Sequence, residues 1–303
     1  MSDAAIRTAD LGKRYGRITA LAGLALEVPR GAVFGFLGPN GAGKTTAVKL
    51  LLGLSSPTSG EAWLLGAPVS DAAAHRAARG RVGYLPELFR YQGWLTAREV
   101  LALHCDLMGL ARSLWQRESD RVLDVVSLTD RAGTRVSTFS KGMQQRLGLA
   151  AALLGSPDLV LLDEPTSALD PVGRHDVREI IRALRAQGTT VFLNSHLLSE
   201  VELVCDRVAI VDRGRVVASG TFDELLAGDT VRIRVTGLPD DGLARFGTQQ
   251  QRDGEWLVIR GMDASGIPDL VVEAIRLGGR VHAVEPAHES LEDRFLSLLG
   301  KDP

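Results

Sequence analysis

The sequence predicts an α/β fold built on a parallel sheet, and three observations lead to this fold class. Strand-like and helix-like segments alternate through the first two thirds of the chain, as they do in parallel sheets with crossover helices. Residues 159–162 are entirely apolar, which is typical of a central strand buried on both faces. A glycine-rich loop at residues 38–46 follows an apolar strand at 32–37 and precedes a helix expected at 47–54.

The other elements follow in chain order. Residues 5–36 are β-rich, because short apolar segments there are separated by glycines. Further strands are predicted at residues 61–65, 81–85, 190–193 and 207–211, helices at 71–79 and 171–187, and a mostly helical stretch at 96–132. After about residue 228 the pattern changes to strict alternation, with Val231, Ile233 and Val235 on one face of a strand. Residues 229–303 are therefore expected to form a small accessory α+β domain.

Length and composition limit the possible classes of function. The chain has 303 residues, which suggests about two domains. Its net charge of −2 gives no electrostatic reason to expect nucleic-acid binding. The longest apolar stretch, near residues 147–154, is shorter than the ~18 residues of a membrane helix. Cys105 and Cys205 are expected to be buried, reduced thiols, which suits a cytoplasmic protein.

The glycine-rich loop fits the Walker A pattern G-x-x-x-x-G-K-[ST]. Glycines let successive backbone N–H groups turn inward around phosphate oxygens, and the N-terminus of the following helix also favours an anion. Lys44 is expected to reach the β- and γ-phosphates, and the Thr45 hydroxyl to bind Mg²⁺. The predicted phosphate-binding residues are Gly38, Pro39, Asn40, Gly41, Ala42, Gly43, Lys44, Thr45 and Thr46.

A second motif follows the apolar strand at residues 159–162. Two adjacent carboxylates, Asp163 and Glu164, stand where this strand ends, which is typical of Walker B. Asp163 is expected to hold Mg²⁺ through the ion's water shell, and Glu164 to orient or deprotonate the attacking water. Together the two motifs predict hydrolysis of a nucleoside triphosphate.

A third motif at residues 139–146 makes the resemblance specific. It is similar to the signature motif LSGGQ of ABC-type ATPases, and four positions match, namely Ser140, Gly142, Gln144 and Arg146. Three positions depart from it, namely Phe139, Lys141 and Met143, as they do in one branch of exporters. The resemblance implies that Ser140 and Gly142 contact an ATP molecule held by the opposite subunit.

Further matches appear in the order of this family. Tyr15 resembles the aromatic residue that stacks on adenine, and His196 the switch histidine that contacts the γ-phosphate. The motif at residues 167–170, which ends in Asp170, resembles the loop that crosses the dimer interface. Glu87 stands where the family usually has a glutamine, and it is either a ligand of the metal or its water or a spectator. The remaining histidines, such as His75, are expected at the surface.

The resemblance extends over residues 5–225 and implies a P-loop ATPase of ABC type. Its ATPase domain is expected at residues 1–228, with a β-rich N-terminal subdomain and a helical subdomain at about 88–155. A short match at residues 289–296 resembles the end of bacterial exporter ATPases. The implied cofactors are ATP and Mg²⁺. The implied partners are a separate membrane permease and a second ATPase subunit, identical or paralogous, on the inner face of the membrane.

Residues 89–95 are rich in aromatic side chains and leave two interpretations open. By resemblance this segment meets the coupling helix of the membrane subunit, while the alternative is that it packs in the helical subdomain. Two other functions compete with transport. A soluble ABC ATPase acting on ribosomes or DNA is less favoured, because the chain has one cassette and no long coiled coil. A small-molecule kinase would not need the signature motif and His196 together.

Overall fold

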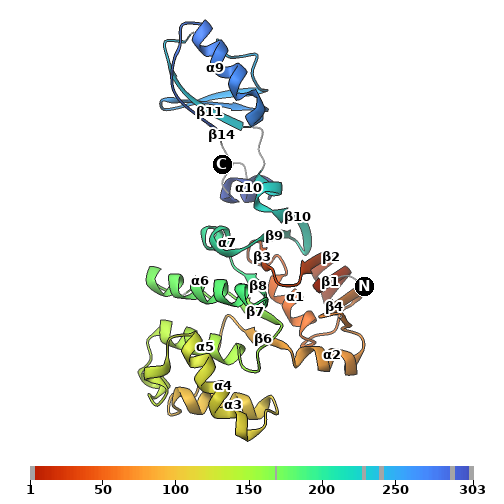
Figure 1. The fold of residues 1–303 in the computed structure, drawn as a ribbon. Coiled ribbons are helices and arrows are strands. Elements are labelled where there is room, and N and C mark those ends of the chain that lie inside the picture. The colour runs from red at the N-terminus through yellow and green to blue at the C-terminus, as the bar shows by residue number, and fades with distance from the viewer. Residues whose placement is uncertain (1–3, 168, 227–229, 239–241, 287–290, 300–303) are drawn as a thin grey trace. The chain divides into compact units, whose positions relative to one another are not determined.

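The computed structural model describes residues 4–167, 169–226, 230–238, 242–286 and 291–299, and Figure 1 shows the ribbon. The chain divides into two compact units, Met1–Thr221 and Phe222–Pro303. The division lies slightly before the boundary expected after residue 228, and residues 227–229 are not described. In the described part of the chain, no helix combines the length and the apolar character needed to cross a bilayer.

A six-stranded sheet forms the centre of the first unit, in the order β10-β9-β3-β8-β7-β6. All neighbours pair in parallel except β10, which is antiparallel at one edge. The strands are Val33–Leu37 (β3), Val82–Leu85 (β6), Leu159–Asp163 (β7), Thr190–Asn194 (β8), Arg207–Asp212 (β9) and Arg215–Thr221 (β10). Every residue of β3, β7 and β8 is buried, which confirms the predicted parallel sheet with apolar central strands.

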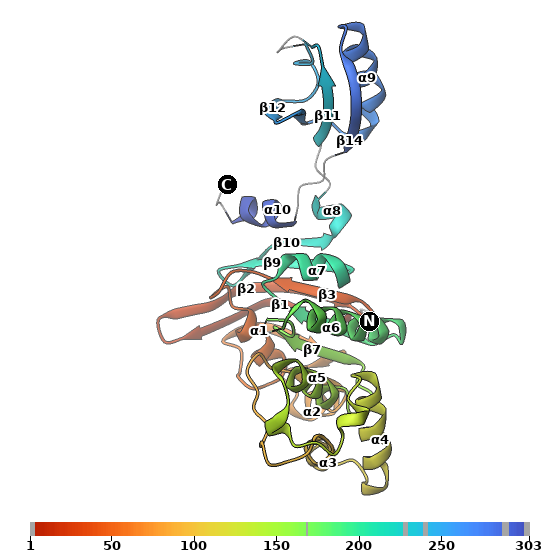
Figure 2. The ribbon, with the colours of Figure 1, turned by 90° about the vertical axis from the view of Figure 1, so that its left-hand side faces the viewer.

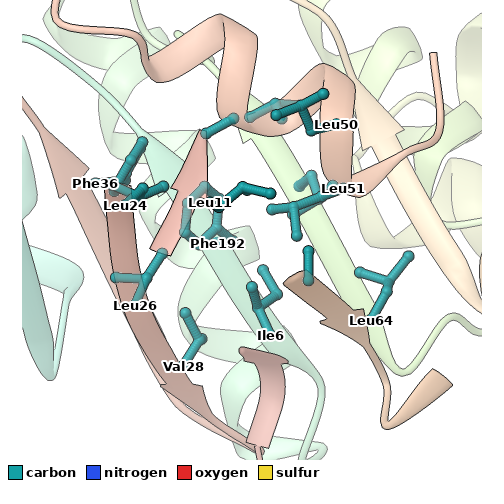
Figure 3. Close-up of a cluster of buried hydrophobic side chains, with 14 of the residues drawn as sticks. Ile6, Leu11, Leu24, Leu26, Val28, Phe36, Leu50, Leu51, Leu64 and Phe192 are labelled. Atoms are coloured by element: carbon teal, nitrogen blue, oxygen red, sulfur yellow. The ribbon is translucent and has the colours of Figure 1, made fainter. Parts of the chain in front are cut away.

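A second, antiparallel sheet has the order β2-β1-β4-β5. Its strands are Ala4–Tyr15 (β1), Ile18–Pro29 (β2), Ser59–Leu64 (β4) and Ala67–Pro68 (β5). Apolar side chains of this sheet, of helix α1 and of the central sheet meet in one core, shown in Figure 3 with residues such as Ile6, Leu51 and Phe192. Because this core holds β3 and α1 in place, it also fixes the loop between them.

Among its described residues, the first unit has seven α-helices beside the sheets. They are Lys44–Leu51 (α1), Ala72–Arg79 (α2), Ala97–Leu107 (α3), Arg112–Val125 (α4), Lys141–Ala152 (α5), Pro171–Ala186 (α6) and Leu198–Val204 (α7). Helices α3, α4 and α5 contact one another and lie together at the bottom of Figures 1 and 2. Helix α3 begins with a capping box, in which Thr96 and Glu99 satisfy each other's backbone N–H groups.

The second unit is a small α+β fold. Its sheet has the order β12-β13-β11-β14, and the α9 residues Leu270 and Ala274 share its apolar core with Val231 and Ile233 of β11. The elements are Phe222–Leu226 (α8), Thr230–Thr236 (β11), Gln249–Asp253 (β12), Trp256–Arg260 (β13), Ile267–Arg276 (α9), Arg280–Pro286 (β14) and Leu291–Leu298 (α10). The alternation predicted for β11 agrees with this burial.

Two expectations from the sequence are wrong. Helix α1 begins three residues earlier and ends three residues earlier than the expected 47–54, because Gly43 and Gly53 bound it with φ of 102° and 68°. His75 is buried rather than at the surface, with 4% of its area exposed. Its Nε2 lies 2.7 Å from the carbonyl oxygen of Leu51, at the C-terminal end of α1. Both cysteines are buried and free, as expected.

Candidate active site

The glycine-rich loop joins β3 to α1 at the carboxyl edge of the central sheet. Gly41 and Gly43 adopt φ values of 83° and 102°, which residues with a Cβ rarely adopt. A Cβ on Gly38 would lie 2.3 Å from the carbonyl oxygen of Val211. No side chain caps the N-terminus of α1. Because the first N–H groups of a helix lack intrahelical partners, this end of α1 can receive an anion.

Lys44 is the first residue of α1, and only 7% of it is exposed. Its Nζ donates hydrogen bonds to the carbonyl oxygens of Gly38 at 2.6 Å and Pro39 at 3.2 Å. Burial lowers the pKa of Lys44, although the negative charges of Glu164, Asp163 and Glu87 act in the opposite direction. The ammonium group therefore lies inside the loop and among carboxylates.

The other predicted loop residues differ in exposure. Ala42 is buried, its N–H donates to the Pro39 carbonyl at 3.1 Å, and its own carbonyl accepts from the N–H of Gly214 at 2.9 Å. Asn40 and Thr45 are exposed, and Thr46 is half-buried. The loop is thus fastened to the core on one side and open to solvent on the other.

Asp163 is the last residue of β7, and 2% of it is exposed. Its Oδ1 accepts a hydrogen bond from Nδ2 of Asn194, the last residue of the neighbouring strand β8. Burial raises the pKa of Asp163, and the hydrogen bond from Asn194 works against that rise. A buried carboxylate that is held in this way is a suitable ligand for a cation.

Glu164 and His196 meet at the same edge of the sheet. The Oε2 atom of Glu164 lies 2.7 Å from Nδ1 of His196, within hydrogen-bond distance. Glu164 has a φ of 53°, and its N–H donates to the Asn194 carbonyl at 2.9 Å. Positive φ is uncommon for residues other than glycine and recurs at functional sites. The backbone thus holds the Glu164 carboxylate against the imidazole.

Two further predicted residues are exposed. Glu87 is exposed, but its charge acts on both Lys44 and Asp163, so it belongs to the same electrostatic cluster. Tyr15 is 46% exposed at the end of β1, and the Nζ of Lys13 lies 4.8 Å from its ring centroid. One face of the Tyr15 ring therefore carries a cation, and the side chain remains accessible.

Ser140, Gly142 and Asp170 form a second site rather than part of the first. They line a hollow of ≈ 370 Å³ whose lining includes no residue of the glycine-rich loop. Ser140 caps α5 by accepting from the N–H of Met143 at 3.2 Å. Asp170 caps α6 in the same way, through the N–H of Gly173 at 2.8 Å. Ala168 of the same loop lies outside the described residues.

Sequence reasoning gave no role to Asn194, although it contacts both acidic residues of the site. A usable signal was present, because Asn194 ends an apolar strand in the same way as Asp163 does. The contact itself could not be read from the sequence, because 31 residues separate the two positions.

The residues at this edge fit a triphosphate with a divalent cation. Among the described residues there is no group of three or more His, Cys, Asp or Glu that could hold a metal. Mg²⁺ commonly takes one or two protein ligands together with phosphates and water, and Asp163 with Thr45 is such a donor set. In the described structure the buried Oδ1 of Asn194 also lacks a hydrogen-bond partner, which leaves a polar group for a ligand.

Comparison with known protein sequences gives matches along the whole chain. A family model described as ABC transporter matches residues 21–167. An uncharacterized ABC transporter ATP-binding protein of Nostoc sp. is 40% identical over 311 residues, which cover 98% of this chain and 90% of that protein. The Nod factor export ATP-binding protein I of Paraburkholderia xenovorans is 36% identical over 309 residues, which cover 100% and 99%.

Solved structures with the same fold match the larger part of the chain. An ATP-binding subunit of an ABC transporter is 31% identical with a TM-score of 0.66, and the match covers 74% of this chain and 92% of that one. The cbiO1 protein of Clostridium perfringens, part of the ABC transporter complex cbiONQ, is 25% identical with a TM-score of 0.67. That match covers 75% of this chain and 92% of cbiO1.

Proposed function

The chain belongs to the family of ATP-binding subunits of ABC transporters, and on that premise we propose that it drives export by closing as a dimer around ATP. As a member of this family it binds and hydrolyses ATP. The observation that carries the proposal is the pair of separate sites, one around Lys44 and one around Ser140. In this proposal each chain supplies one half of two shared ATP sites.

We assign the chemistry to the residues at the carboxyl edge of the sheet. The Glu164 carboxylate accepts the proton of the attacking water, and its hydrogen bond with His196 holds it in place. Lys44 moves from its two carbonyl partners to the β- and γ-phosphates, where it stabilises the negative charge of the transition state. Thr45 and Asp163 would hold Mg²⁺, which when bound neutralises charge on the phosphate oxygens.

Other residues contact the adenine base of ATP and supply the second half of each shared site. Tyr15 stacks on adenine with the ring face that Lys13 leaves free. Ser140 and Gly142, at the N-terminus of α5, contact the triphosphate held by the partner subunit. Asp170, at the N-terminus of α6, lies in the same interface. Hydrolysis removes the charge that joins the two subunits, and the dimer opens.

ABC ATP-binding subunits pair with membrane permease components, and we propose a groove in the first unit as the permease-binding surface. This groove has a volume of ≈ 520 Å³, and its lining includes Phe89, Tyr91 and Leu107. Phe89 and Tyr91 are half-buried and their rings lie 5.4 Å apart, while Leu88 and Trp94 beside them are 88% and 70% exposed. The half-buried pair thus forms part of the groove wall, and the exposed side chains of Leu88 and Trp94 are available for further contact with the permease.

The names of several relatives support an outward direction of transport. Several similar proteins over the full length of this chain are named Nod factor export ATP-binding proteins. We extend the outward direction of transport to this chain, and place it at the inner face of the cell membrane, bound to its permease.

The test is nucleotide-dependent dimerisation of the Glu164→Gln variant of the purified chain. Removing the carboxylate base should slow hydrolysis by about 10²–10⁴-fold and leave ATP bound. Light scattering should then show a mass twice that of the monomer after ATP is added. The matched control is Glu164→Gln combined with Gly142→Glu, which should bind ATP but remain monomeric.

The structure supports this choice of control. A Cβ on Gly142 would meet nothing nearer than 3.8 Å, so the substitution fits the chain and changes only what can approach it. Hydrolysis at the parental rate by Glu164→Gln would remove Glu164 from the mechanism. A monomer that binds ATP and consumes it only when an acceptor is added would indicate a kinase instead.

A further inference from the structure

We propose that Asn194 is a positioning residue of the metal site. In this proposal its amide N–H fixes one oxygen of Asp163, and its amide oxygen accepts a hydrogen bond from a water bound to the divalent cation. The inference rests on the proposed ATPase site and extends it by a residue to which no motif assigns a role.

The order of the strands places Asn194 between the two motifs that bind the phosphates and the metal. Strand β8 lies between β3, which leads into the glycine-rich loop, and β7, which ends in Asp163. Asn194 pairs in register with Phe36 of β3 and with Asp163 of β7. Neighbouring strands are about 4.8 Å apart. A side chain at this position can therefore reach groups held by either neighbour.

Asn194 already contacts both acidic residues. Asn194 is 2% exposed, and its side-chain Nδ2 donates to Oδ1 of Asp163. Its backbone carbonyl oxygen accepts a hydrogen bond from the backbone N–H of Glu164 at 2.9 Å. The first bond occupies one oxygen of the Asp163 carboxylate and leaves the other for a cation. The second fixes the backbone that carries the Glu164 side chain. One residue thus orients the metal ligand and the base.

The amide oxygen of Asn194 has no partner of its own. It is buried, and no hydrogen bond reaches it within the described part of the chain. Turning the amide over would not resolve this, because Oδ1 would then face the carboxylate oxygen of Asp163 and two acceptors would meet. A buried acceptor without a donor lowers stability, so its presence points to a ligand that completes it.

The opposite end of the same strand shows how a purely structural polar residue behaves. Thr190 is buried at 1% exposure, and its Oγ1 accepts the N–H of Gly31 at 2.9 Å. The three residues between Thr190 and Asn194 are apolar. Only the end that adjoins the phosphate loop and the carboxylates carries an unpartnered atom. A bound cation has several waters that could donate to it.

The experiment compares the full-length Asn194→Leu variant with the parent, using Mn²⁺ as the probe for the cation. Free Mn²⁺ is measured by electron paramagnetic resonance during titration of the protein with bound ADP, and ADP affinity is measured separately in EDTA. Leucine has a similar shape but lacks both polar atoms. We expect Mn²⁺ affinity to fall by about 10–100-fold, as is typical for residues that orient metal ligands, while ADP affinity in EDTA is unchanged.

The matched control is Thr190→Val in the same strand. It removes a buried hydrogen bond far from the metal, so it should lower the melting temperature and leave Mn²⁺ affinity at the parental value. Should Asn194→Leu not fold, Asn194→Ser replaces it, since serine fits the space but cannot span the distance to Asp163. The same fall in Mn²⁺ affinity is expected.

The possible outcomes separate the role of Asn194 from the proposed ATPase site on which that role rests. Parental Mn²⁺ affinity in the folded Asn194 variant, together with loss of affinity in Asp163→Asn, would overturn the role of Asn194 and leave the ATPase site intact. An equal fall in the Thr190→Val control would make the role merely structural. A parent that holds no Mn²⁺ with its nucleotide would instead contradict the proposed metal site itself.

Discussion

The two sites that we propose for ATP on a single chain are built in opposite ways. Around Lys44, Asp163 and Glu164 the side chains are buried, hydrogen-bonded and charged, and the backbone of one residue other than glycine, Glu164, is in the left-handed region. Around Ser140 and Gly142 the surface is open, and the polar side chains serve as helix caps. The first site is organised before a ligand arrives, whereas Ser140 and Asp170 of the second site are hydrogen-bonded only to the helix ends that they cap in the described structure.

In the proposed function, catalysis and assembly therefore use different surfaces of one chain. Buried charges at the carboxyl edge of the sheet need packed walls around them, because electrostatic stabilisation depends on fixed groups with little solvent. A surface that must meet another subunit has to stay accessible. The predictions that follow test this division, beginning with the largest expected effect.

Mixing two inactive variants should restore hydrolysis if each ATP site is shared between chains. Lys44→Ala removes the cation of the first site and Gly142→Glu blocks the second, and each should lower the rate of ATP hydrolysis by roughly 10²-fold or more. A dimer of one Lys44→Ala chain and one Gly142→Glu chain keeps one intact site. That site consists of the glycine-rich loop of the Gly142→Glu chain and the signature motif of the Lys44→Ala chain. Phosphate release by the mixture should recover to at most about a quarter of the parental rate, since half of the dimers are mixed.

The control for this mixture is a second pair of variants that both alter the first site. Lys44→Ala mixed with Glu164→Gln leaves no intact site in any dimer, so no recovery is expected. No recovery in the first pair although mixed dimers form would show that one chain holds a whole site, and recovery in the second pair would show that Lys44 and Glu164 of one chain serve different sites.

Tyr15 is proposed to contact the adenine base rather than the phosphates, so it should affect binding alone. Stacking on a base contributes ~1–3 kcal/mol, so Tyr15→Ala should raise the dissociation constant for ATP by roughly tenfold. Affinity for tripolyphosphate, which has no base, should not change. The rate at saturating ATP should stay near that of the parent, and Tyr15→Phe, which keeps the ring, should bind ATP normally. Equal losses for ATP and tripolyphosphate would contradict the stacking role.

The smallest effect concerns stability and distinguishes the buried site from the exposed one. Burial raises the pKa of Asp163 above its usual 3.8, so folding favours the protonated carboxyl group. The stabilising contribution is complete below pH 3.8 and is lost as the pH rises through the higher pKa of the folded protein. At pH 7 the parent therefore carries a destabilising charge when nucleotide and metal are absent.

Replacing Asp163 with asparagine should remove that cost. The melting temperature of the ligand-free Asp163→Asn variant at pH 7 should exceed that of the parent by a few degrees, and the gap should narrow as the pH falls toward 4. Scanning calorimetry at several pH values measures this gap. Gly142→Glu, at the exposed site, should leave the melting temperature close to that of the parent, and a lower melting temperature for Asp163→Asn would contradict the argument.

Much of the fold was predictable because its central strands and its phosphate loop follow from the local order of apolar residues and glycines. The apolar strands that end at Leu37, Asp163 and Asn194 are visible as runs of apolar residues, and the glycine-rich loop is defined by spacing. Boundaries were less certain, as α1 shows. The start of this helix depends on Gly43 adopting a left-handed conformation, which is possible for glycine but is not demanded by the local sequence.

Contacts between distant segments were not predictable in the same way. His75 follows a polar, alanine-rich pattern and was expected at the surface, but α2 packs it against the end of α1. The hydrogen bonds of Asp163 to Asn194 and of Glu164 to His196 depend on β8 lying beside β7. Strand order in this sheet does not follow chain order, so no local pattern determines it.

The sequence by itself determined the kinds of groups available and the strand ends and loops on which they stand, because backbone conformation and burial follow from short-range composition. The tertiary structure alone decided which of those groups meet. It placed β8 between β3, which leads into the phosphate loop, and β7, which ends in Asp163. It left the side-chain amide oxygen of Asn194 without a donor, and it put Ser140 in a hollow that is not lined by the loop of Lys44. Those contacts join segments that lie far apart in the chain. Each contact depends on the packing of many other residues in both segments, so no short stretch of sequence determines it.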